Sequence, residues 1–243
     1  MQISEQEKRE LAPSGTMRVG LNYQNFLLVG RDSPDGTPNG IAPDLARELA
    51  RRAGLPIQYL RYDTAGKLAD AVKDGAWDVA FLGNEPARAD VISFSSAYLE
   101  IPITFLVPAG SPIRSIDQVD AAGVRVAVSA KSAYDLYLTR TLKKAQVVRV
   151  DGIEASFRAF VDQKLEALGG LKPRLVADAE ELAGSRVLEG QISAVQQSVG
   201  VPKARGQAAA FLRRFVREIK AEGLVGRLIQ KHGVRGVGVA PQD

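Results

Sequence analysis

Short apolar runs alternate with amphipathic stretches along the first part of the chain. The runs 17–21 and 57–62 are typical of strands. Between them, a stretch opened by Pro43 and Asp44 carries apolar residues at helical spacing, and Thr64 can cap the next helix. The order strand, helix, strand, helix, strand indicates βαβ units and a mostly parallel sheet. The pattern therefore predicts an α/β lobe.

The same order recurs further along the chain. A strand and turn in 123–132 lead into a helix from Ala133, and a strand over 145–150 is followed by a helix over 152–164. Two amphipathic helices over 204–223 and 224–232 close the pattern. This repetition predicts two similar lobes.

Composition narrows the class of protein. The chain has 243 residues, 45% hydrophobic and 25% charged, and no apolar run approaches the roughly 18 residues of a membrane span. The net charge of +4 is spread among acids, which argues against a nucleic-acid partner. With no cysteine and one histidine, disulfides, thiol catalysis and a zinc site are not expected, and no cofactor or metal is predicted.

The first thirteen residues are charged and lack the apolar core of a signal peptide. Either the chain is a mature form with an added start, or it is made without an export signal.

The stretch 78–98 contains the residues best suited to bind a ligand. A strand predicted to be buried is followed by a loop with Gly83, Asn84 and Pro86, and Arg88 comes next. Ligands of open α/β sheets bind at the carboxyl ends of the strands, where a guanidinium can grip a carboxylate through two parallel hydrogen bonds. The alternative is a solvated arginine. The nearby Trp77 is predicted to anchor the core.

This stretch resembles the signature segment of the family 3 solute-binding proteins, the amino-acid-binding components of ABC importers. In that family a strand beginning with Asp ends at Gly or Ser, an arginine then grips the ligand carboxylate, and a phrase like F-S-x-P-Y follows. The matching positions here are Asp78, Gly83, Arg88, Phe94, Ser95 and Tyr98. The resemblance covers about 17–241.

The resemblance implies the type II periplasmic-binding-protein fold, an α/β architecture of two Rossmann-like lobes joined by a two-strand hinge. Lobe one is expected to be discontinuous, over 1–104 and 194–243, and lobe two to span 105–193. Binding then needs two half-sites and a hinge that closes them around the ligand.

The resemblance also implies the site residues. In lobe one, Asn22, Tyr23 and Phe26 follow the first strand, with Tyr23 or Phe26 stacking on the ligand. The alternative is that Phe26 packs under its loop. Arg88 is the charge clamp, with the Gly83 backbone and the Asn84 amide beside it, and Glu85 is expected to point to solvent. We expect Arg88→Ala to abolish binding with little loss of folding.

In lobe two, Lys131 and Ser132 stand where the family has a G-T/S-T phrase against the ligand carboxylate. The alternative is that Ser132 only caps its helix. Leu171 occupies the position of the aspartate that binds the ligand ammonium, and Lys172 follows it. Because a buried ammonium without a carboxylate is costly, these two residues argue against an ordinary amino acid ligand. Asp178 could substitute only if the local geometry differs.

We therefore predict a monomeric, periplasmic solute-binding component of an ABC importer, with a cytoplasmic location as the alternative. Its partners are a small carboxylate ligand and a membrane permease. One rival is a stand-alone sensory domain. Another is a dehydratase-like enzyme with Glu85 or Glu100 as the acid, although no acid–base pair is recognisable in the sequence.

Overall fold

The computed structural model describes residues 2–242. The chain divides into two compact units. Unit 1 consists of Met1–Glu100 and Gln196–Asp243, and unit 2 of Ile101–Val195.

Helices and strands alternate through both units. The helices are α1 (Glu5–Leu11), α2 (Ile41–Ala53), α3 (Ala65–Asp70), α4 (Ala133–Thr141), α5 (Ile153–Asp162), α6 (Lys172–Glu181), α7 (Gly206–Ala221) and α8 (Leu224–Lys231), with short 3₁₀ helices at Ala71–Asp74, Pro86–Arg88 and Ile116–Gln118. The strands are β1 (Met17–Asn22), β2 (Ile57–Tyr62), β3 (Val79–Gly83), β4 (Ile92–Val107), β5 (Arg125–Ser129), β6 (Gln146–Val150), β7 (Ala167–Leu171), β8 (Arg186–Val187), β9 (Ser193–Pro202) and β10 (Gly238–Val239).

Two strands carry the chain across the boundary between the units. Unit 1 passes into unit 2 within β4, after Glu100, and unit 2 returns to unit 1 within β9, after Val195. The breaks predicted from the sequence, after 104 and after 193, fall within the same two strands.

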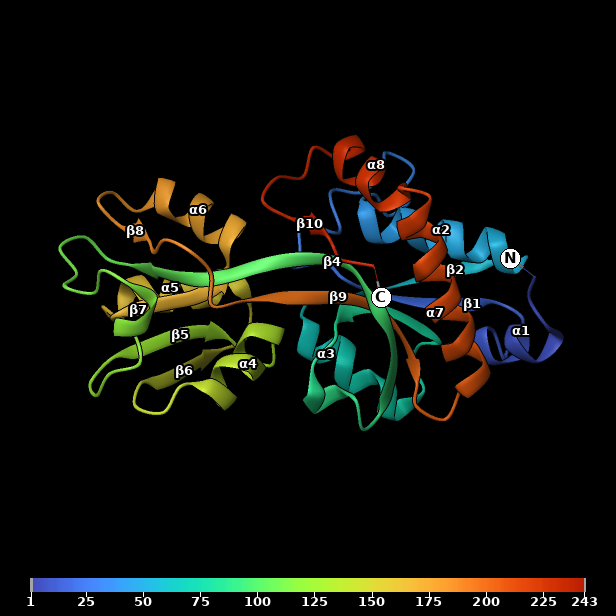
Figure 1. Cartoon of the computed structure of the whole chain (residues 1–243), viewed down its shortest axis with the longest axis horizontal. Coiled ribbons are helices and arrows are strands. Elements are labelled where there is room, and N and C mark those ends of the chain that lie inside the picture. The colour runs from blue at the N-terminus through green and yellow to red at the C-terminus, as the bar shows by residue number, and fades with distance from the viewer. Residues whose placement is uncertain (1, 243) are drawn as a thin grey trace. The chain divides into compact units, whose positions relative to one another are not determined.

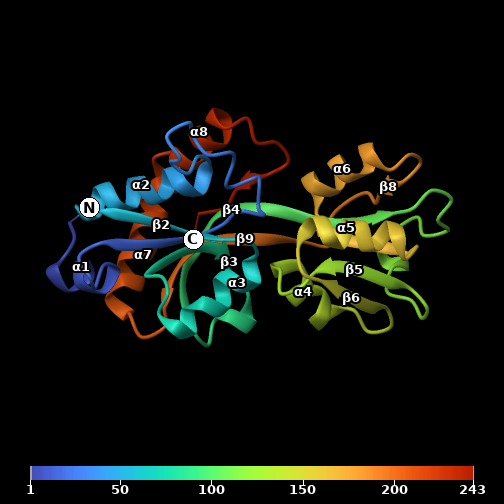
Figure 2. The ribbon, with the colours of Figure 1, turned by 180° about the vertical axis from the view of Figure 1, so that it is seen from behind.

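Unit 1 has a parallel sheet with β1 in the middle. Its strand order is β2-β1-β3, with Met17 opposite Ile57 and Val19 opposite Val79. Helix α2 connects β1 to β2 and α3 lies between β2 and β3, on opposite sides of the strands in Figures 1 and 2. The connections from β1 and into β3 thus cover different faces, which makes the gap between these two strands a topological switch point.

Unit 2 repeats this arrangement. Its parallel strands have the order β7-β5-β6, with β5 in the middle, and β4 pairs antiparallel with β7. Helix α4 connects β5 to β6 and α5 connects β6 to β7, crossing in front of the strands in Figure 2. The switch point of unit 2 therefore lies between β5 and β7.

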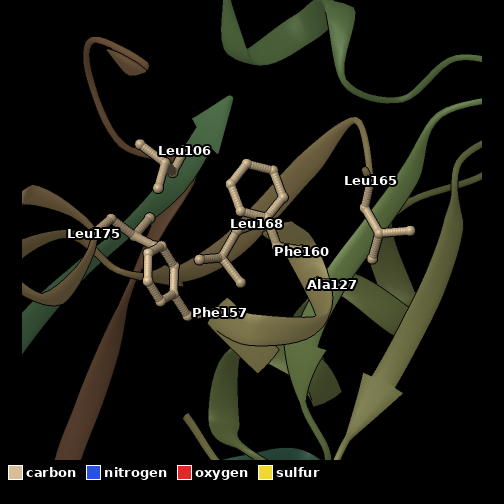
Figure 3. Close-up of a cluster of buried hydrophobic side chains, with 7 residues drawn as sticks. All are labelled: Leu106, Ala127, Phe157, Phe160, Leu165, Leu168 and Leu175. Atoms are coloured by element: carbon tan, nitrogen blue, oxygen red, sulfur yellow. The ribbon is translucent and has the colours of Figure 1, made fainter. Parts of the chain in front are cut away.

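Each unit has its own apolar core. In unit 1, Trp77 is fully buried and donates from Nε1 to the Leu68 carbonyl at 2.8 Å, which confirms its predicted role as a core anchor. In unit 2, apolar side chains from the strands, α5, α6 and the connection between α5 and β7 form one cluster (Figure 3). They are Leu106, Ala127, Phe157, Phe160, Leu165, Leu168 and Leu175.

One ion pair occurs at the same place in both units, at the amino ends of the two switch-point strands. In unit 1, Arg18 donates from its backbone N–H and Nε to Oδ2 of Asp78, at 3.0 and 2.9 Å. In unit 2, Arg125 donates from the same two groups to Oε2 of Glu166, at 2.8 and 2.9 Å. Each pair links the start of the middle strand, β1 or β5, to the residue just before the neighbouring strand, β3 or β7.

None of the helices within residues 2–242 has the length and apolar character to cross a membrane.

Candidate ligand-binding site

The predicted site residues collect at the switch-point strands of their own units. In unit 1, Asn22 ends β1 and Tyr23 and Phe26 follow it, while Gly83 ends β3 and Asn84 and Arg88 follow that strand. In unit 2, Lys131 and Ser132 follow β5. Because these are carboxyl ends of parallel strands, each set lies at the edge where open α/β sheets bind ligands.

Arg88 ends the 3₁₀ helix Pro86–Arg88 and is buried, with 4% of its surface exposed. Its Nη1 donates to the Gly83 carbonyl at 2.7 Å, so the guanidinium folds back on the end of β3. Burial lowers the pKa of Arg88 to about 10, although the carboxylates of Glu85 and Asp70 oppose this effect, and the side chain is charged at neutral pH. The solvated alternative is wrong.

This burial changes the expected outcome of Arg88→Ala. Removing a buried cation leaves neighbouring polar groups without their partner, so the substitution should destabilise unit 1 as well as any ligand complex. The expectation of little loss of folding was drawn from spacing alone.

Glu85 does not point to solvent, contrary to the expectation from the sequence. Only 8% of its surface is exposed. A carboxylate can be buried at this position because the Arg88 guanidinium lies close enough to interact with it electrostatically. Asn84, by contrast, is exposed, and its backbone N–H donates to the Gln196 carbonyl at 2.7 Å.

The loop after β1 presents its two aromatic residues differently. Phe26 is 46% exposed, so it does not pack under the loop. Tyr23 is half-buried, with the Arg61 guanidinium 4.4 Å from its ring centroid and Asp32 accepting a hydrogen bond from its hydroxyl at 3.2 Å. The Asn22 side chain accepts a hydrogen bond from the Gln24 N–H at 3.2 Å. Of the two aromatic side chains, Phe26 is the one that stands open to solvent.

At the first helix of unit 2, Ser132 caps α4 by accepting the Asp135 N–H at 3.0 Å. The carboxylate of Asp135 in turn accepts the backbone N–H of Lys131 at 2.8 Å and pairs with Arg149. Lys131 has a left-handed backbone with φ of +56°, a conformation that glycine adopts more easily. The loop therefore has the backbone shape of a glycine turn, but the backbone N–H of Lys131 already donates a hydrogen bond to the carboxylate of Asp135.

The second switch-point strand of unit 2 leads into a small pocket that the sequence did not reveal. Its lining comes from α4, α5, β7 and α6, and comprises Tyr134, Ile153, Ser156, Leu168, Gly169, Gly170, Leu171, Arg174, Leu175 and Asp178. Leu171, at the position of the family's ammonium-binding aspartate, is 5% exposed. Two sequence signals marked α6 as a helix: Pro173 in its first turn, and the four-residue spacing of Arg174 and Asp178.

The residues considered as a catalytic acid are engaged in other ways. Glu85 is buried near the Arg88 guanidinium, and Glu100 accepts a hydrogen bond from Nε2 of Gln196 at 2.9 Å. Within residues 2–242, no group of three or more His, Cys, Asp or Glu side chains is placed to hold a metal ion.

A family model named "Bacterial extracellular solute-binding proteins, family 3" matches residues 17–235. The chain belongs to this family. The match begins with β1 and ends after α8, so it includes every switch-point strand described above. It confirms the resemblance and the type II periplasmic-binding-protein fold that the signature segment implied.

Solved structures support the same fold for this family 3 solute-binding protein. A mutant of ArgBP from T. maritima is 22% identical, with a TM-score of 0.76, over 93% of this chain and 99% of that one. An amino acid ABC transporter substrate-binding protein from Streptococcus pneumoniae, bound to L-arginine, is 17% identical, with a TM-score of 0.74, over 96% and 99%. An ancestral amino acid-binding protein, a precursor of cyclohexadienyl dehydratase, is 21% identical, with a TM-score of 0.73, over 92% and 98%.

Proposed function

We propose that this protein is the solute-binding component of an ABC importer and takes a small carboxylate or amino-acid-like solute at the two switch points. Arg88, the Gly83 backbone and Asn84 hold the solute in unit 1, and Ser132 and Lys131 hold it in unit 2. Phe26, with Tyr23 and Asn22 from the same loop, supplies the aromatic contact. The protein works as a periplasmic monomer that delivers its solute to a membrane permease.

The observation that carries this proposal is the family match over 17–235. Two features of the fold support it. Both units have a switch point with polar or charged residues at the carboxyl ends of its strands, and two strands join the units, as a hinge requires. Arg88 is a cation at the end of a fully buried strand, where its charge favours an anionic group.

A ligand screen tests the proposal. Thermal denaturation of the purified chain is followed with amino acids, keto acids, dicarboxylates and aromatic acids. A ligand at about a hundred times its dissociation constant adds about 2.7 kcal/mol to the free energy of unfolding, which is readily detected. The proposal predicts that at least one small carboxylate raises the midpoint. If the whole panel leaves the midpoint unchanged, the protein is not a binding protein for such solutes.

The role of Arg88 is tested with the ligand found in that screen. Arg88→Ala is expected to weaken binding by about 2–5 kcal/mol, because a desolvated charge pair is lost. Arg88→Lys keeps the charge but not the planar fork, so it should bind more weakly than the wild type and better than Arg88→Ala.

Arg186→Ala is the matched control. It removes a half-buried guanidinium on β8 that donates to the Ile113 carbonyl, at no switch point. Calorimetry at a temperature where circular dichroism shows each variant folded separates lost binding from lost structure. Unchanged affinity in Arg88→Ala would remove that residue from the site.

A further inference from the structure

The pocket of unit 2 contains a buried carboxylate that the predicted site does not use. Asp178 is 1% exposed and lies on α6, in the lining of the same pocket as Leu171. Its Oδ1 accepts a hydrogen bond from Nε of Arg174 at 2.6 Å. Within residues 2–242 no group donates a hydrogen bond to its Oδ2. One oxygen of a buried carboxylate is thus left to accept a donor from outside the protein.

The ion pairs around the pocket leave Asp178 only partly compensated. Arg174 also donates from Nη2 to Glu154 at 2.8 Å, so its guanidinium is divided between two carboxylates, while Glu154 has a second partner in Arg158. In the sequence, Lys172 directly follows Leu171 and argues against an ammonium ligand, but this residue does not line the pocket. Its Nζ donates to the Gly190 carbonyl at 3.0 Å. The lysine that follows Leu171 is therefore directed to another partner.

The remaining walls are mainly apolar, apart from Tyr134 and Ser156, and the pocket is small. Leu168 and Leu175 belong both to the pocket lining and to the hydrophobic cluster of unit 2 (Figure 3). The enclosed space holds about one water molecule, which is also the size of an ammonium group. A charged group entering such a place loses its water, so it must be paired there, and a carboxylate is the partner that a cation needs.

We propose that Asp178 is a specificity-determining residue that accepts a protonated amino group of the ligand, replacing the carboxylate that Leu171 removes from the end of β7. This inference rests on the proposed function and deepens it. The ligand is then an amino acid or another small carboxylate with a cationic nitrogen, and a carboxylate without such a nitrogen binds more weakly.

The experiment compares matched ligands on matched variants of the full chain. Each amino acid of the panel with an uncharged side chain is paired with the same acid lacking the α-amino group, for example leucine with 4-methylpentanoic acid. The variant Asp178→Asn removes the charge but keeps an oxygen for Arg174. The control Glu180→Gln neutralises an exposed carboxylate on the same helix, outside the pocket.

The wild type should bind an amino acid at least about 30-fold more tightly than its des-amino partner. Asp178→Asn should lose most of that ratio, while Glu180→Gln keeps it. The double variant Leu171→Asp with Asp178→Asn returns the carboxylate to the strand end and should restore part of the ratio, which a merely structural role of Asp178 would not produce.

Several results would overturn the inference. If the wild type binds des-amino acids as tightly as amino acids, or if Asp178→Asn keeps the full ratio, Asp178 does not read the amino group, while the binding function stands. If no acid of either kind binds the wild type, the proposed function fails and this inference fails with it. If Asp178→Asn does not fold, Asp178→Glu, which keeps the charge but moves the carboxylate by one methylene group, takes its place in the comparison, and an unchanged ratio in that variant overturns the inference.

Discussion

The two units are alike at one edge of their sheets and different at the other. At the amino ends of the switch-point strands, Arg18 with Asp78 and Arg125 with Glu166 form the same contacts. At the carboxyl ends, unit 1 has the buried guanidinium of Arg88, and unit 2 has a pocket lined by the buried carboxylate of Asp178 and its partner Arg174. The repeated edge holds strands in register, whereas the divergent edge carries the residues that we propose to bind the ligand.

The repeated ion pair is also unequal in its surroundings. Asp78 is completely buried and receives a second guanidinium, from Arg205 at 2.9 Å. Glu166 is 35% exposed and has Arg125 as its only ion-pair partner within residues 2–242. The same pair should therefore contribute far more to the stability of unit 1 than to that of unit 2.

The largest effect is expected from two substitutions, each of which breaks this ion pair in one unit. Asp78→Asn should lower the free energy of unfolding by about 3–5 kcal/mol, because Arg18 and Arg205 lose their shared buried counter-charge. Glu166→Gln should cost about 1 kcal/mol or less, because water screens the exposed pair. Urea denaturation followed by circular dichroism measures both. Equal losses in the two variants would contradict the comparison.

Acid titration sharpens the same comparison. Burial alone would raise the pKa of Asp78, but hydrogen bonds from Arg18 and Arg205 outweigh it and hold the pKa below its ordinary value of 3.8. A carboxyl with a depressed folded pKa contributes stability above its unfolded pKa and loses it as the pH falls through the folded value. The difference in unfolding free energy between wild type and Asp78→Asn should therefore be constant at neutral pH and shrink below about pH 4. A difference that persists unchanged at pH 2 would mean that the ion pair is not its source.

A smaller effect is expected where a strand packs closely on its helix. A methyl group on Gly20 of β1 would lie 2.4 Å from Cδ1 of Leu68, and one on Gly169 of β7 would lie 2.9 Å from Cδ1 of Leu138. Overpacking of this kind costs about 1–3 kcal/mol, so Gly20→Ala should destabilise more than Gly169→Ala. Chemical denaturation ranks the two variants. The reverse order would show that the helix of unit 1 yields more easily.

The smallest expected effect concerns the loop after β5. Lys131 has a positive φ, and Lys164 is the only other non-glycine residue between 2 and 242 that does. Lys131→Gly removes the strain of a side chain in this conformation but adds freedom to the unfolded chain, so it should raise the free energy of unfolding by no more than about 1 kcal/mol. Lys131→Val should lower it. Thermal denaturation of the two variants against wild type measures the difference, and a stabilising valine would show that the loop can change its backbone.

Much of the fold could be predicted because its signals are local. Apolar runs and caps mark the strands and helices of both units, and the repeat of their order indicates two similar lobes. Local signals also mark two helices that the apolar pattern does not predict. Ser4 and Glu7 form the capping box that begins α1, and Pro173 lies in the first turn of α6.

The chemistry of the site was less predictable because it depends on partners far apart in the sequence. Arg18 and Asp78 meet only because β1 and β3 are neighbours. Spacing does not reveal that Glu85 is buried near Arg88, or that Lys172 reaches the Gly190 carbonyl instead of the pocket. Strand order and side-chain direction decide which charged groups meet, and neither can be predicted from the local sequence around those groups.

The division of the chain has a consequence for how the protein is made. Unit 2 is one continuous segment and is complete when Val195 has been added. Unit 1 still lacks the rest of β9 and all of α7 and α8 at that moment, and its last segment, Gln196–Asp243, adds 48 residues. At synthesis rates of about 5–20 residues per second, the unit that starts first waits several seconds after the other is finished. During that interval β3 lacks the neighbour that β9 later provides, so the nascent chain carries an open sheet edge that the finished protein does not.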